Sequence, residues 1–226
     1  MPVLDPRLFA ALQEQLRGRD ELLRRGARRV GWKLGMGERE AIGDHIAVGY
    51  LTTATVIDAD RRYYVAARGD RELHVDAEVC VEFGRDVGQD PGPEGIHGAI
   101  ARCWPALEIV NLAPLANEPE SVVADNFFHC AVAFGGKPIP LTCAEQVTSY
   151  VNGRCGERES WPSDLPDRIA SAAAILAALD QRIRAGDRVI TGSITQLPFT
   201  AGDLLQARFG NHASVTVHTA RKATAA

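Results

Sequence analysis

The chain has 226 residues, of which 46% are hydrophobic and 24% are charged, and its formal net charge is -4. This composition is that of an ordinary globular protein, and the length is sufficient to bury a sizeable core in one domain. The slightly negative charge provides no general attraction to nucleic acid. We therefore expect no nucleic-acid partner and a small molecule as the ligand.

The sequence shows no sign of a membrane or secretory segment. No apolar run approaches the roughly 20 residues that a membrane-spanning helix needs, and the N-terminus lacks the basic-then-apolar order of a signal peptide. We expect no membrane partner and a cytoplasmic location. The five cysteines are widely spaced without a C-x-x-C pair, which argues for reduced, mostly buried thiols rather than disulfides or a zinc site.

In chain order, the first expected elements are two short helices. The Asp5-Pro6 pair is typical of a helix start, and a second helix is expected from Asp20. The four arginines within residues 24–29 form either a solvated face or a grip for an anion or a neighbouring subunit. Residues 36–58 mix glycines and acids without a clean period, which is typical of a mobile flap.

The remaining elements are mainly strands. Glycine and proline predict a loop over residues 85–98, followed by a short helix over 96–104. The strongest helical pattern covers residues 163–184, with Ser163 or Asp164 as its cap and Gly186 at its end. Because strands outnumber helices, we predict a β-rich α+β fold. The expected strands are 30–35, 63–67, 75–83, 105–111, 127–134, 141–152, 188–191, 204–209 and 213–219.

The most informative stretch is residues 75–83. In a strand, side chains alternate between the two faces, so Asp76 and Glu78 lie on one face and apolar residues on the other. Neighbouring carboxylates repel each other, and burial raises their pKa unless a positive group lies between them. A hard divalent cation bound through oxygen is the natural candidate. The alternative is that this face points at water on the outside of a sheet.

Glu108 and Lys33 are charged residues inside apolar runs. A carboxylate in a run such as Leu107-Glu108-Ile109 is rarely buried unless it is paired or bound to a metal. Lys33 follows Trp32, and its position indicates either a functional group or a surface lysine at a strand end.

Other polar residues are open to simpler interpretations. Asp125-Asn126 fits a plain turn. The histidines at 74, 97, 129, 212 and 218 are scattered, and each is expected to be structural rather than a metal ligand.

Several segments together resemble one family in their order along the chain. They are GWKLG at 31–35, DAE at 76–78, PALEIV at 105–110, ADN at 124–126 and AGDRVITGS at 185–193, followed by GD at 202–203. Over about residues 20–218 the chain is similar to the 2-keto-4-pentenoate hydratases of the fumarylacetoacetate hydrolase superfamily, which also includes the 4-oxalocrotonate decarboxylases. The resemblance implies a rolled mixed β-sheet of the fumarylacetoacetate hydrolase C-terminal type, with short N-terminal helices and one long flanking helix. It implies a single domain over 1–226, with an N-terminal helical segment (1–30) and a catalytic domain (31–226).

The resemblance also implies a cofactor and its ligands. Mg²⁺ or Mn²⁺ is expected on Asp76, Glu78 and Glu108, with Lys33, Glu78 and Glu108 as the catalytic residues. Asp76 departs from the family, which has glutamate at this position and thus about 1.5 Å more reach. Whether Asp76 binds the metal directly or through a water is left open.

Further residue roles follow from the same resemblance. Lys33, Asn126, Thr191 and Ser193 are expected to bind the substrate, although Thr191 and Ser193 also fit a hydrogen-bonded turn after a strand. Hydrolases of the superfamily carry a Glu-His pair on a flap in this region. Glu38 or Glu40 with His45 are the candidates for such an acid/base pair.

The expected activity is that of a hydratase, a lyase of aromatic catabolism. It adds water to a 2-hydroxy-2,4-dienoate, the enol form of a 2-keto-4-enoate, by way of a metal-stabilised enolate. The alternatives are a decarboxylase of an oxalocrotonate-like 2-keto diacid, a carbon–carbon hydrolase of an acylpyruvate, and a non-catalytic relative that binds a keto acid or a partner. A homo-oligomer is expected.

Overall fold

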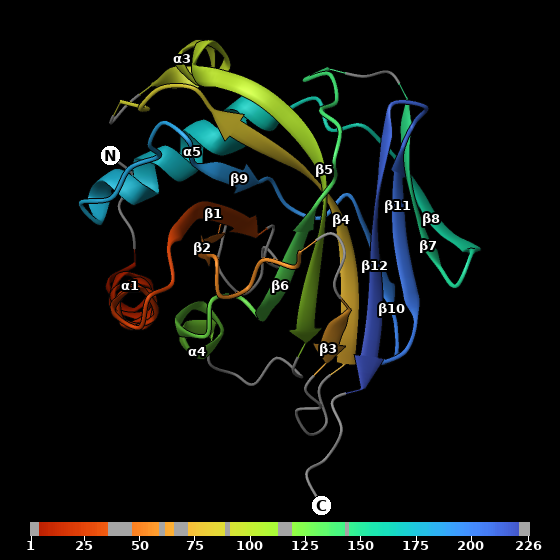
Figure 1. Cartoon of the computed structure of the whole chain (residues 1–226). Coiled ribbons are helices and arrows are strands. Elements are labelled where there is room, and N and C mark those ends of the chain that lie inside the picture. The colour runs from red at the N-terminus through yellow and green to blue at the C-terminus, as the bar shows by residue number, and fades with distance from the viewer. Residues whose placement is uncertain are drawn as a thin grey trace, which may run out of the picture.

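The structure is a computed structural model that describes residues 5–35, 47–58, 62–65, 72–88, 91–112, 119–142 and 145–221 (Figure 1). The helices are α1 (Pro6–Arg24), α3 (Gly92–Ala99), α4 (Pro119–Ala124) and α5 (Leu165–Ala178). The strands are β1 (Arg29–Gly35), β2 (Ala47–Thr52), β3 (Tyr63–Val65), β4 (Glu72–Phe83), β5 (Ile100–Leu112), β6 (His129–Phe134), β7 (Gln146–Val151), β8 (Arg154–Ser160), β9 (Arg188–Ile190), β10 (Thr195–Pro198), β11 (Leu204–Phe209) and β12 (Ala213–Arg221).

The described strands form two sheets. The seven-stranded sheet has the order β2-β1-β9-β4-β5-β6, with β10 paired to β4, and the five-stranded sheet has the order β3-β12-β11-β7-β8. Both are mixed sheets, because β1 and β9 run parallel, as do β12 and β3, among otherwise antiparallel neighbours. The strands curl around one another, and the five-stranded sheet packs beside β5 and β10 (Figure 1). The predicted β-rich α+β fold with a rolled mixed sheet is confirmed.

The long strands β4 and β5 form the centre of the molecule. They pair in register, with Asp76 opposite Glu108 and Ala77 opposite Leu107. One face of this pair is apolar and packs into the main hydrophobic core together with residues of α5 and of the five-stranded sheet. Burial of this face stabilises the fold by roughly 25 cal/mol for each Å² of apolar surface removed from water. The opposite face of the same two strands carries the acids.

The N-terminal region is one helix rather than the two short helices expected. α1 continues through Gly18 and Asp20, and the Asp5 side chain accepts a hydrogen bond from the Arg7 amide at its start. Residues buried along one side of α1 (Ala11, Leu12, Gln15 and Arg19) extend past the expected break. Tertiary packing of this side outweighs the low helix propensity of a single glycine.

Several boundaries also differ from the predicted ones. β5 begins at Ile100, so residues 100–104 are strand instead of helix, and α3 occupies much of the expected loop. The physical reason is the register with β4, which continues through Cys103 opposite Val81 and Trp104 opposite Cys80. β8 was not predicted because all of its side chains are exposed, which leaves no apolar alternation.

The long helix α5 is shorter than its sequence pattern indicates. It ends at Ala178 instead of continuing to residue 184, because Asp180 takes a left-handed conformation with φ of 54°. Asp164 is its N-terminal cap residue, but the Asp164 carboxylate accepts from Arg168 and not from the helix backbone.

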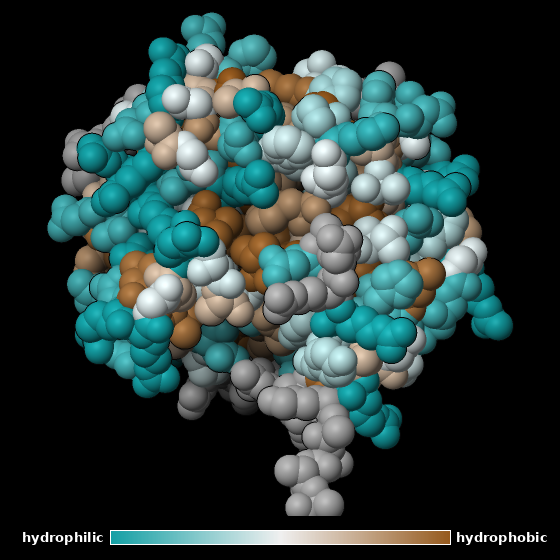
Figure 2. All heavy atoms as spheres, in the orientation of Figure 1, coloured by the Kyte–Doolittle hydropathy of each residue, from teal (hydrophilic) through white to brown (hydrophobic). Residues whose placement is uncertain are grey.

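In the described part of the chain, no helix combines the length and the apolar character needed to cross a membrane. Among the described cysteines, Cys80 and Cys103 are buried, Cys130 is half-buried and Cys155 is exposed, and Cys80, Cys103 and Cys155 are free thiols. Figure 2 shows hydrophilic residues over most of the viewed face, with hydrophobic ones exposed near its middle.

Candidate metal centre

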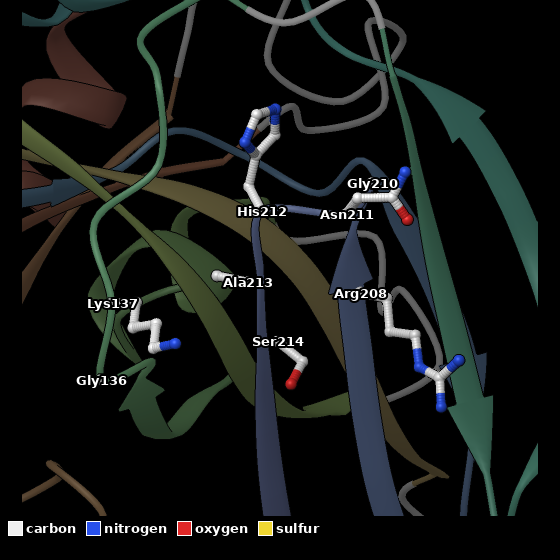
Figure 3. Close-up of a pocket in the computed structure, with 8 residues that line it drawn as sticks. All are labelled: Gly136, Lys137, Arg208, Gly210, Asn211, His212, Ala213 and Ser214. Carbon is white, nitrogen blue, oxygen red and sulfur yellow. The ribbon is translucent and has the colours of Figure 1, made fainter.

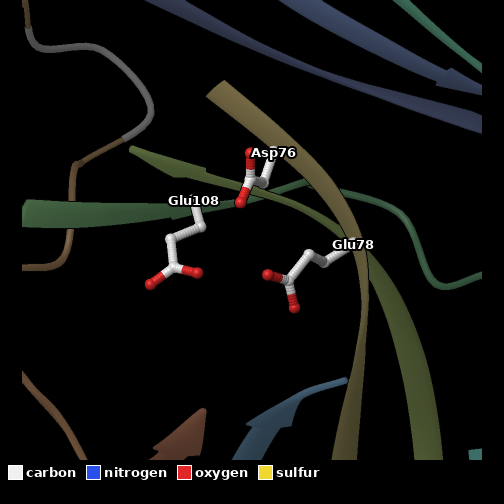
Figure 4. Close-up of side chains that lie close together, drawn as sticks. All are labelled: Asp76, Glu78 and Glu108. Carbon is white, nitrogen blue, oxygen red and sulfur yellow. The ribbon is translucent and has the colours of Figure 1, made fainter. Parts of the chain in front are cut away.

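Three carboxylates meet on the polar face of β4 and β5. Asp76 and Glu78 project from the same face of β4, and Glu108 projects from β5 directly opposite Asp76. One ligand oxygen from each of the three lies within 4.8 Å of the others. Figure 4 shows the three side chains pointing into a common space. The shorter Asp76 side chain therefore still reaches the cluster.

The carboxylate face is buried, so the alternative that it points at water is wrong. Asp76 is 5% exposed, Glu78 is 1% exposed and Glu108 is 2% exposed. Three acids so close together repel one another in a medium that screens their charges poorly. A positive group or bound protons must therefore compensate them.

Each carboxylate has one oxygen held by a protein donor. The Gly192 amide donates to Glu78 Oε2 at 2.7 Å. Gly192 lies in the loop after β9 and has a φ of 97°, a backbone conformation that favours glycine. The Gln196 side chain, on β10 opposite Asp76, hydrogen-bonds to Asp76. Asp76 Oδ1 is buried without a hydrogen-bond partner among the described residues. These donors orient the acids and leave oxygen atoms directed at the common space.

Lys33 is the cation that faces this cluster. Lys33 Nζ lies 2.5 Å from Glu108 Oε1, and both side chains are almost fully buried. Lys33 Nζ also donates to the Phe127 carbonyl at 3.2 Å. The interpretation of Lys33 as a surface lysine is therefore wrong.

The turn that presents the Phe127 carbonyl has an unusual backbone. Asn126, Phe127 and Phe128 all have positive φ, between 52° and 62°. Left-handed conformations cost roughly 1–2 kcal/mol for each residue other than glycine, so packing and hydrogen bonds must hold this turn in place. The turn connects α4 to β6 and positions both a carbonyl and His129 beside Glu108.

His129 was not predicted as part of the site. Its Nδ1 lies 2.6 Å from Glu108 Oε1, and its Nε2 lies 2.9 Å from the Thr55 hydroxyl. The side chain is 1% exposed. Glu108 Oε1 thus has two partners, the ammonium of Lys33 and the imidazole of His129.

The pKa values of the three acids are driven apart by their surroundings. Burial, together with the negative charge of Glu108, raises the pKa of Asp76 to about 7 and that of Glu78 well above its usual range. Burial alone would also raise the pKa of Glu108, but Lys33 and His129 outweigh it and bring the value down to about 2. Burial lowers the pKa of His129, which favours the neutral imidazole. Without a metal, Glu78 therefore favours its protonated form near neutral pH, Asp76 titrates there, and Glu108 is ionised.

The structure supports the predicted cofactor, because the cluster fits a divalent cation. If all three acids are ionised and His129 is neutral, Lys33 compensates one of three negative charges, which leaves two for a cation to neutralise. The available ligand atoms are carboxylate oxygens, which suit Mg²⁺ and Mn²⁺. The buried Asp76 oxygen without a hydrogen-bond partner is also explained if it faces a cation. The ligand roles of Asp76, Glu78 and Glu108 remain predictions.

Asn126 lies beside this cluster but is already paired. Its Oδ1 accepts from the Tyr50 amide at 2.9 Å, and its Nδ2 donates to the Tyr50 carbonyl at 3.0 Å. These bonds attach the turn after α4 to β2. The role of Asn126 in substrate binding stays a prediction, and its observed contacts are structural.

Thr191 and Ser193 follow β9, and their hydroxyls bond to backbone. Thr191 Oγ1 donates to the Val79 carbonyl at 2.9 Å, and Ser193 Oγ donates to the Thr195 carbonyl at 3.1 Å. With their protons committed in this way, both hydroxyls are left as acceptors. Their role in binding a substrate carboxylate stays a prediction.

The predicted flap pair lies outside the described residues. Its candidate residues are Glu38, Glu40 and His45.

Three of the four arginines of residues 24–29 pair with acids. Arg24 and Arg25 are exposed beside Glu21, whereas Arg29 pairs with the buried Asp187 at 2.5 Å.

A separate cavity lies at the turn between β11 and β12. It has a volume of about 470 Å³, and Lys137, Arg208, His212 and Ser214 are among its lining residues (Figure 3). None of the predicted site residues within the described part of the chain lines it. The cavity is therefore not the predicted site.

The pKa values predict that metal binding depends on pH. Binding must displace the proton of Asp76, and Glu78 adds a second proton because its pKa is also raised. Asp76 alone, with a pKa of about 7, raises the dissociation constant for Mn²⁺ about tenfold between pH 8 and pH 6, and displacement of the Glu78 proton adds to this, so we expect a rise of at least about tenfold. Glu108 stays ionised throughout this range and does not contribute. Isothermal titration calorimetry in buffers of different ionisation enthalpy measures both the affinity and the protons released, and an affinity independent of pH would contradict the assignment.

Comparison with known proteins supports the fold. No protein-family model matches the chain, and a search of curated proteins found no match. Among solved structures, 4-oxalocrotonate decarboxylase from Pseudomonas putida G7 has a TM-score of 0.81 at 21% identity over 93% of this chain and 85% of that chain. That protein was solved in complex with calcium and acetate and in complex with magnesium and adipate.

Two other enzymes have the same fold at lower similarity. Maleylpyruvate hydrolase from Sphingobium sp. SYK-6 has a TM-score of 0.64 at 15% identity over 96% of this chain and 86% of that chain. The 2-hydroxyhepta-2,4-diene-1,7-dioate isomerase from Mycobacterium marinum has a TM-score of 0.63 at 12% identity over 88% of this chain and 78% of that chain. At these identities the likeness establishes a common fold, which is the fold that the sequence motifs predicted.

Proposed function

We propose that this protein is a divalent-metal-dependent enzyme that acts on a small 2-keto acid. The observation that carries the proposal is the buried cluster of Asp76, Glu78 and Glu108 facing Lys33. A 2-keto acid offers a carboxylate oxygen and a keto oxygen, which are hard ligands suited to the same cation as the three acids. When bound, Mg²⁺ or Mn²⁺ supplies Lewis-acid stabilisation of negative charge at the keto oxygen.

The chain's own residues have distinct roles in this proposal. Asp76, Glu78 and Glu108 hold the cation, and their neighbours Gly192 and His129 orient two of them. Lys33 keeps Glu108 ionised and provides positive charge where negative charge develops in the transition state. Its ammonium group is also positioned to transfer a proton to or from the substrate. Asn126, Thr191 and Ser193 are proposed to line the substrate pocket.

The finer proposal is hydration of a 2-hydroxy-2,4-dienoate. In this reaction the dienol gains a proton on carbon and loses its hydroxyl proton, and water then adds across the conjugated double bond of the resulting 2-keto-enoate, which gives a 4-hydroxy-2-keto acid without any oxidation or reduction. The resemblance of five motifs to the hydratases supports it. Decarboxylation of an oxalocrotonate-like diacid is the alternative, supported by the fold shared with 4-oxalocrotonate decarboxylase.

Two further alternatives rest on other features. Hydrolysis of an acylpyruvate would require an activated water, for which Glu38 or Glu40 with His45 are the candidates. A non-catalytic relative that binds a keto acid would explain the Asp76 substitution. The fold shared with maleylpyruvate hydrolase supports the first alternative, hydrolysis of an acylpyruvate.

One experiment separates these activities. The protein is incubated with Mg²⁺ or Mn²⁺ and, in turn, 2-hydroxypenta-2,4-dienoate, 4-oxalocrotonate and an acylpyruvate, and the products are identified by mass. We expect a mass increase of one water from the dienoate, and the control is the same assay with excess EDTA. Loss of carbon dioxide or carbon–carbon cleavage would move the assignment to a sister activity. Bound metal without turnover of any compound would contradict the proposed substrate class.

The proposal also covers the oligomeric state of the protein and its location in the cell. We propose a homo-oligomer located in the cytoplasm, where free thiols such as those of Cys80, Cys103 and Cys155 are usual. Light scattering coupled to size-exclusion chromatography measures the mass, and a monomer would contradict this part of the proposal.

A further inference from the structure

His129 is held from both sides by residues of different strands and loops. Its Nδ1 contacts Glu108 on β5 at 2.6 Å, and its Nε2 contacts the hydroxyl of Thr55, after β2, at 2.9 Å. The ring is 1% exposed. A planar ring fixed at both nitrogens in a buried position has a single orientation, unlike the flexible side chain of a lysine.

An irregularity in β6 directs His129 toward the acids. Glu108 pairs with Val132 and Ile109 pairs with Ala131, but Val110 pairs with His129. Cys130 is therefore an extra residue that forms a β-bulge. The bulge moves the side chain of the preceding residue, His129, to the other face of the strand. Through this bulge His129 lies on the face of Glu108, where regular alternation would have placed Cys130.

The proton arrangement follows from these contacts. Glu108 forms an ion pair with the Lys33 ammonium and so acts as an acceptor, which means that Nδ1 carries the proton and donates to Glu108 Oε1. In the neutral imidazole, Nε2 then accepts from the Thr55 hydroxyl, which also lies 3.3 Å from the Thr52 carbonyl. Glu108 thus selects the tautomer, and the Thr55 hydroxyl holds the other side of the ring in place.

We propose that His129 is a positioning residue that fixes the Glu108 carboxylate, so that Oε1 is held by the protein and Oε2 is presented to the cation. Lys33 alone would not do this, because an ammonium can pair with either oxygen of a carboxylate as the carboxylate rotates. The donor at Nδ1 removes that freedom, in the same way that outer groups orient the ligands of other metal sites. This inference rests on the proposed function, since it concerns the same cation.

The test is Mn²⁺ affinity, measured by isothermal titration calorimetry on three substitutions of His129. H129N keeps an amide donor near the position of Nδ1, H129Q moves the donor to the position of Nε2, and H129L has no donor. We expect H129N to bind Mn²⁺ within about threefold of the parent protein, and H129Q and H129L to bind about 10–100-fold more weakly. Thermal unfolding without metal is measured in parallel to show that each variant is folded.

The possible outcomes separate this inference from the proposed function. If the parent protein binds Mn²⁺ and H129Q and H129L bind it equally well, the positioning role is overturned and the metal site stands. Equal losses in H129N and H129Q also overturn it, because packing rather than the Nδ1 donor would then be responsible. A parent protein that binds no Mn²⁺ overturns the metal site itself.

Thr55 provides a second variant if substitutions of His129 prevent folding. T55V leaves His129 in place but removes the hydroxyl that fixes its ring. We expect a loss of Mn²⁺ affinity of about threefold to tenfold, and an affinity equal to that of the parent overturns the proposal.

Discussion

Replacing Glu78 by glutamine is expected to weaken Mn²⁺ binding by at least about 100-fold while making the metal-free protein more stable. Burial and the charges of Glu108 and Asp76 raise the pKa of Glu78. A carboxyl group whose pKa is raised on folding disfavours the folded state as pH rises above its unfolded value of 4.5. Glutamine removes this cost and still offers an oxygen to the Gly192 amide.

The stability change has a defined pH dependence. The gain from E78Q is expected to be largest near pH 8 and to shrink as pH falls to 4.5 and below, where the parent carboxyl becomes protonated in both states. For a protein of this length, each kcal/mol raises the unfolding temperature by roughly 2–4 °C. Thermal unfolding between pH 5 and pH 8, with EDTA and with Mn²⁺, measures both effects.

Substitution of Glu108 by glutamine provides the matched control, for which we expect the opposite change in the stability of the metal-free protein. E108Q removes the partner of Lys33 at 2.5 Å and leaves a buried ammonium without its ion pair. The expected loss of stability is about 3 kcal/mol, at the low end for such a pair because Asp76 and Glu78 lie close enough to compensate Lys33 in part. If E78Q and E108Q destabilised the metal-free protein equally, the assigned charge distribution would be wrong.

Much of the fold follows from local patterns in the sequence. The alternation of residues 75–83, the apolar run around Glu108 and the strands near the C-terminus all appear in the structure as β4, β5, β11 and β12. The structure differs from the sequence prediction where pairing with a distant strand, or burial of one side of a helix, determines the secondary structure. Residues 100–104 are strand because β4 lies beside them, and α1 is continuous because one of its sides is buried. A local sequence pattern reveals neither the pairing with β4 nor the packing against one side of α1.

The acids and Lys33 could be predicted, whereas the residues that orient them could not. Charged side chains inside apolar runs are conspicuous in a sequence, which is why Asp76, Glu78, Glu108 and Lys33 were found. His129 was missed because its orientation depends on the bulge at Cys130, and regular alternation places it on the wrong face. The Gly192 amide was missed because a backbone donor has no sequence signature beyond a glycine in a loop.

The proposed chemistry predicts that stability and activity separate at Lys33. K33M keeps most of the apolar stem but removes the charge, so Glu108 loses the cation that most strongly lowers its pKa. We expect turnover of the best substrate to fall about 10²–10³-fold, and the metal-free protein to lose about 3 kcal/mol because a buried pair is broken. Activity assays at saturating metal and thermal unfolding with EDTA measure the two losses.

The double variant K33M/E108Q decides between a structural and a catalytic role for Lys33. Neither charge of the pair remains, so the free energy of unfolding is expected to recover most of what either single substitution loses, and the double variant loses much less than the sum of the two single losses. Turnover is not expected to recover, because the variant still lacks both the ammonium that stabilises developing charge and a proposed metal ligand. A double variant that is stable yet inactive fits the proposal. If K33M alone kept full turnover at saturating metal, Lys33 would serve only to compensate Glu108, and the positive charge at the transition state would have to come from the cation alone.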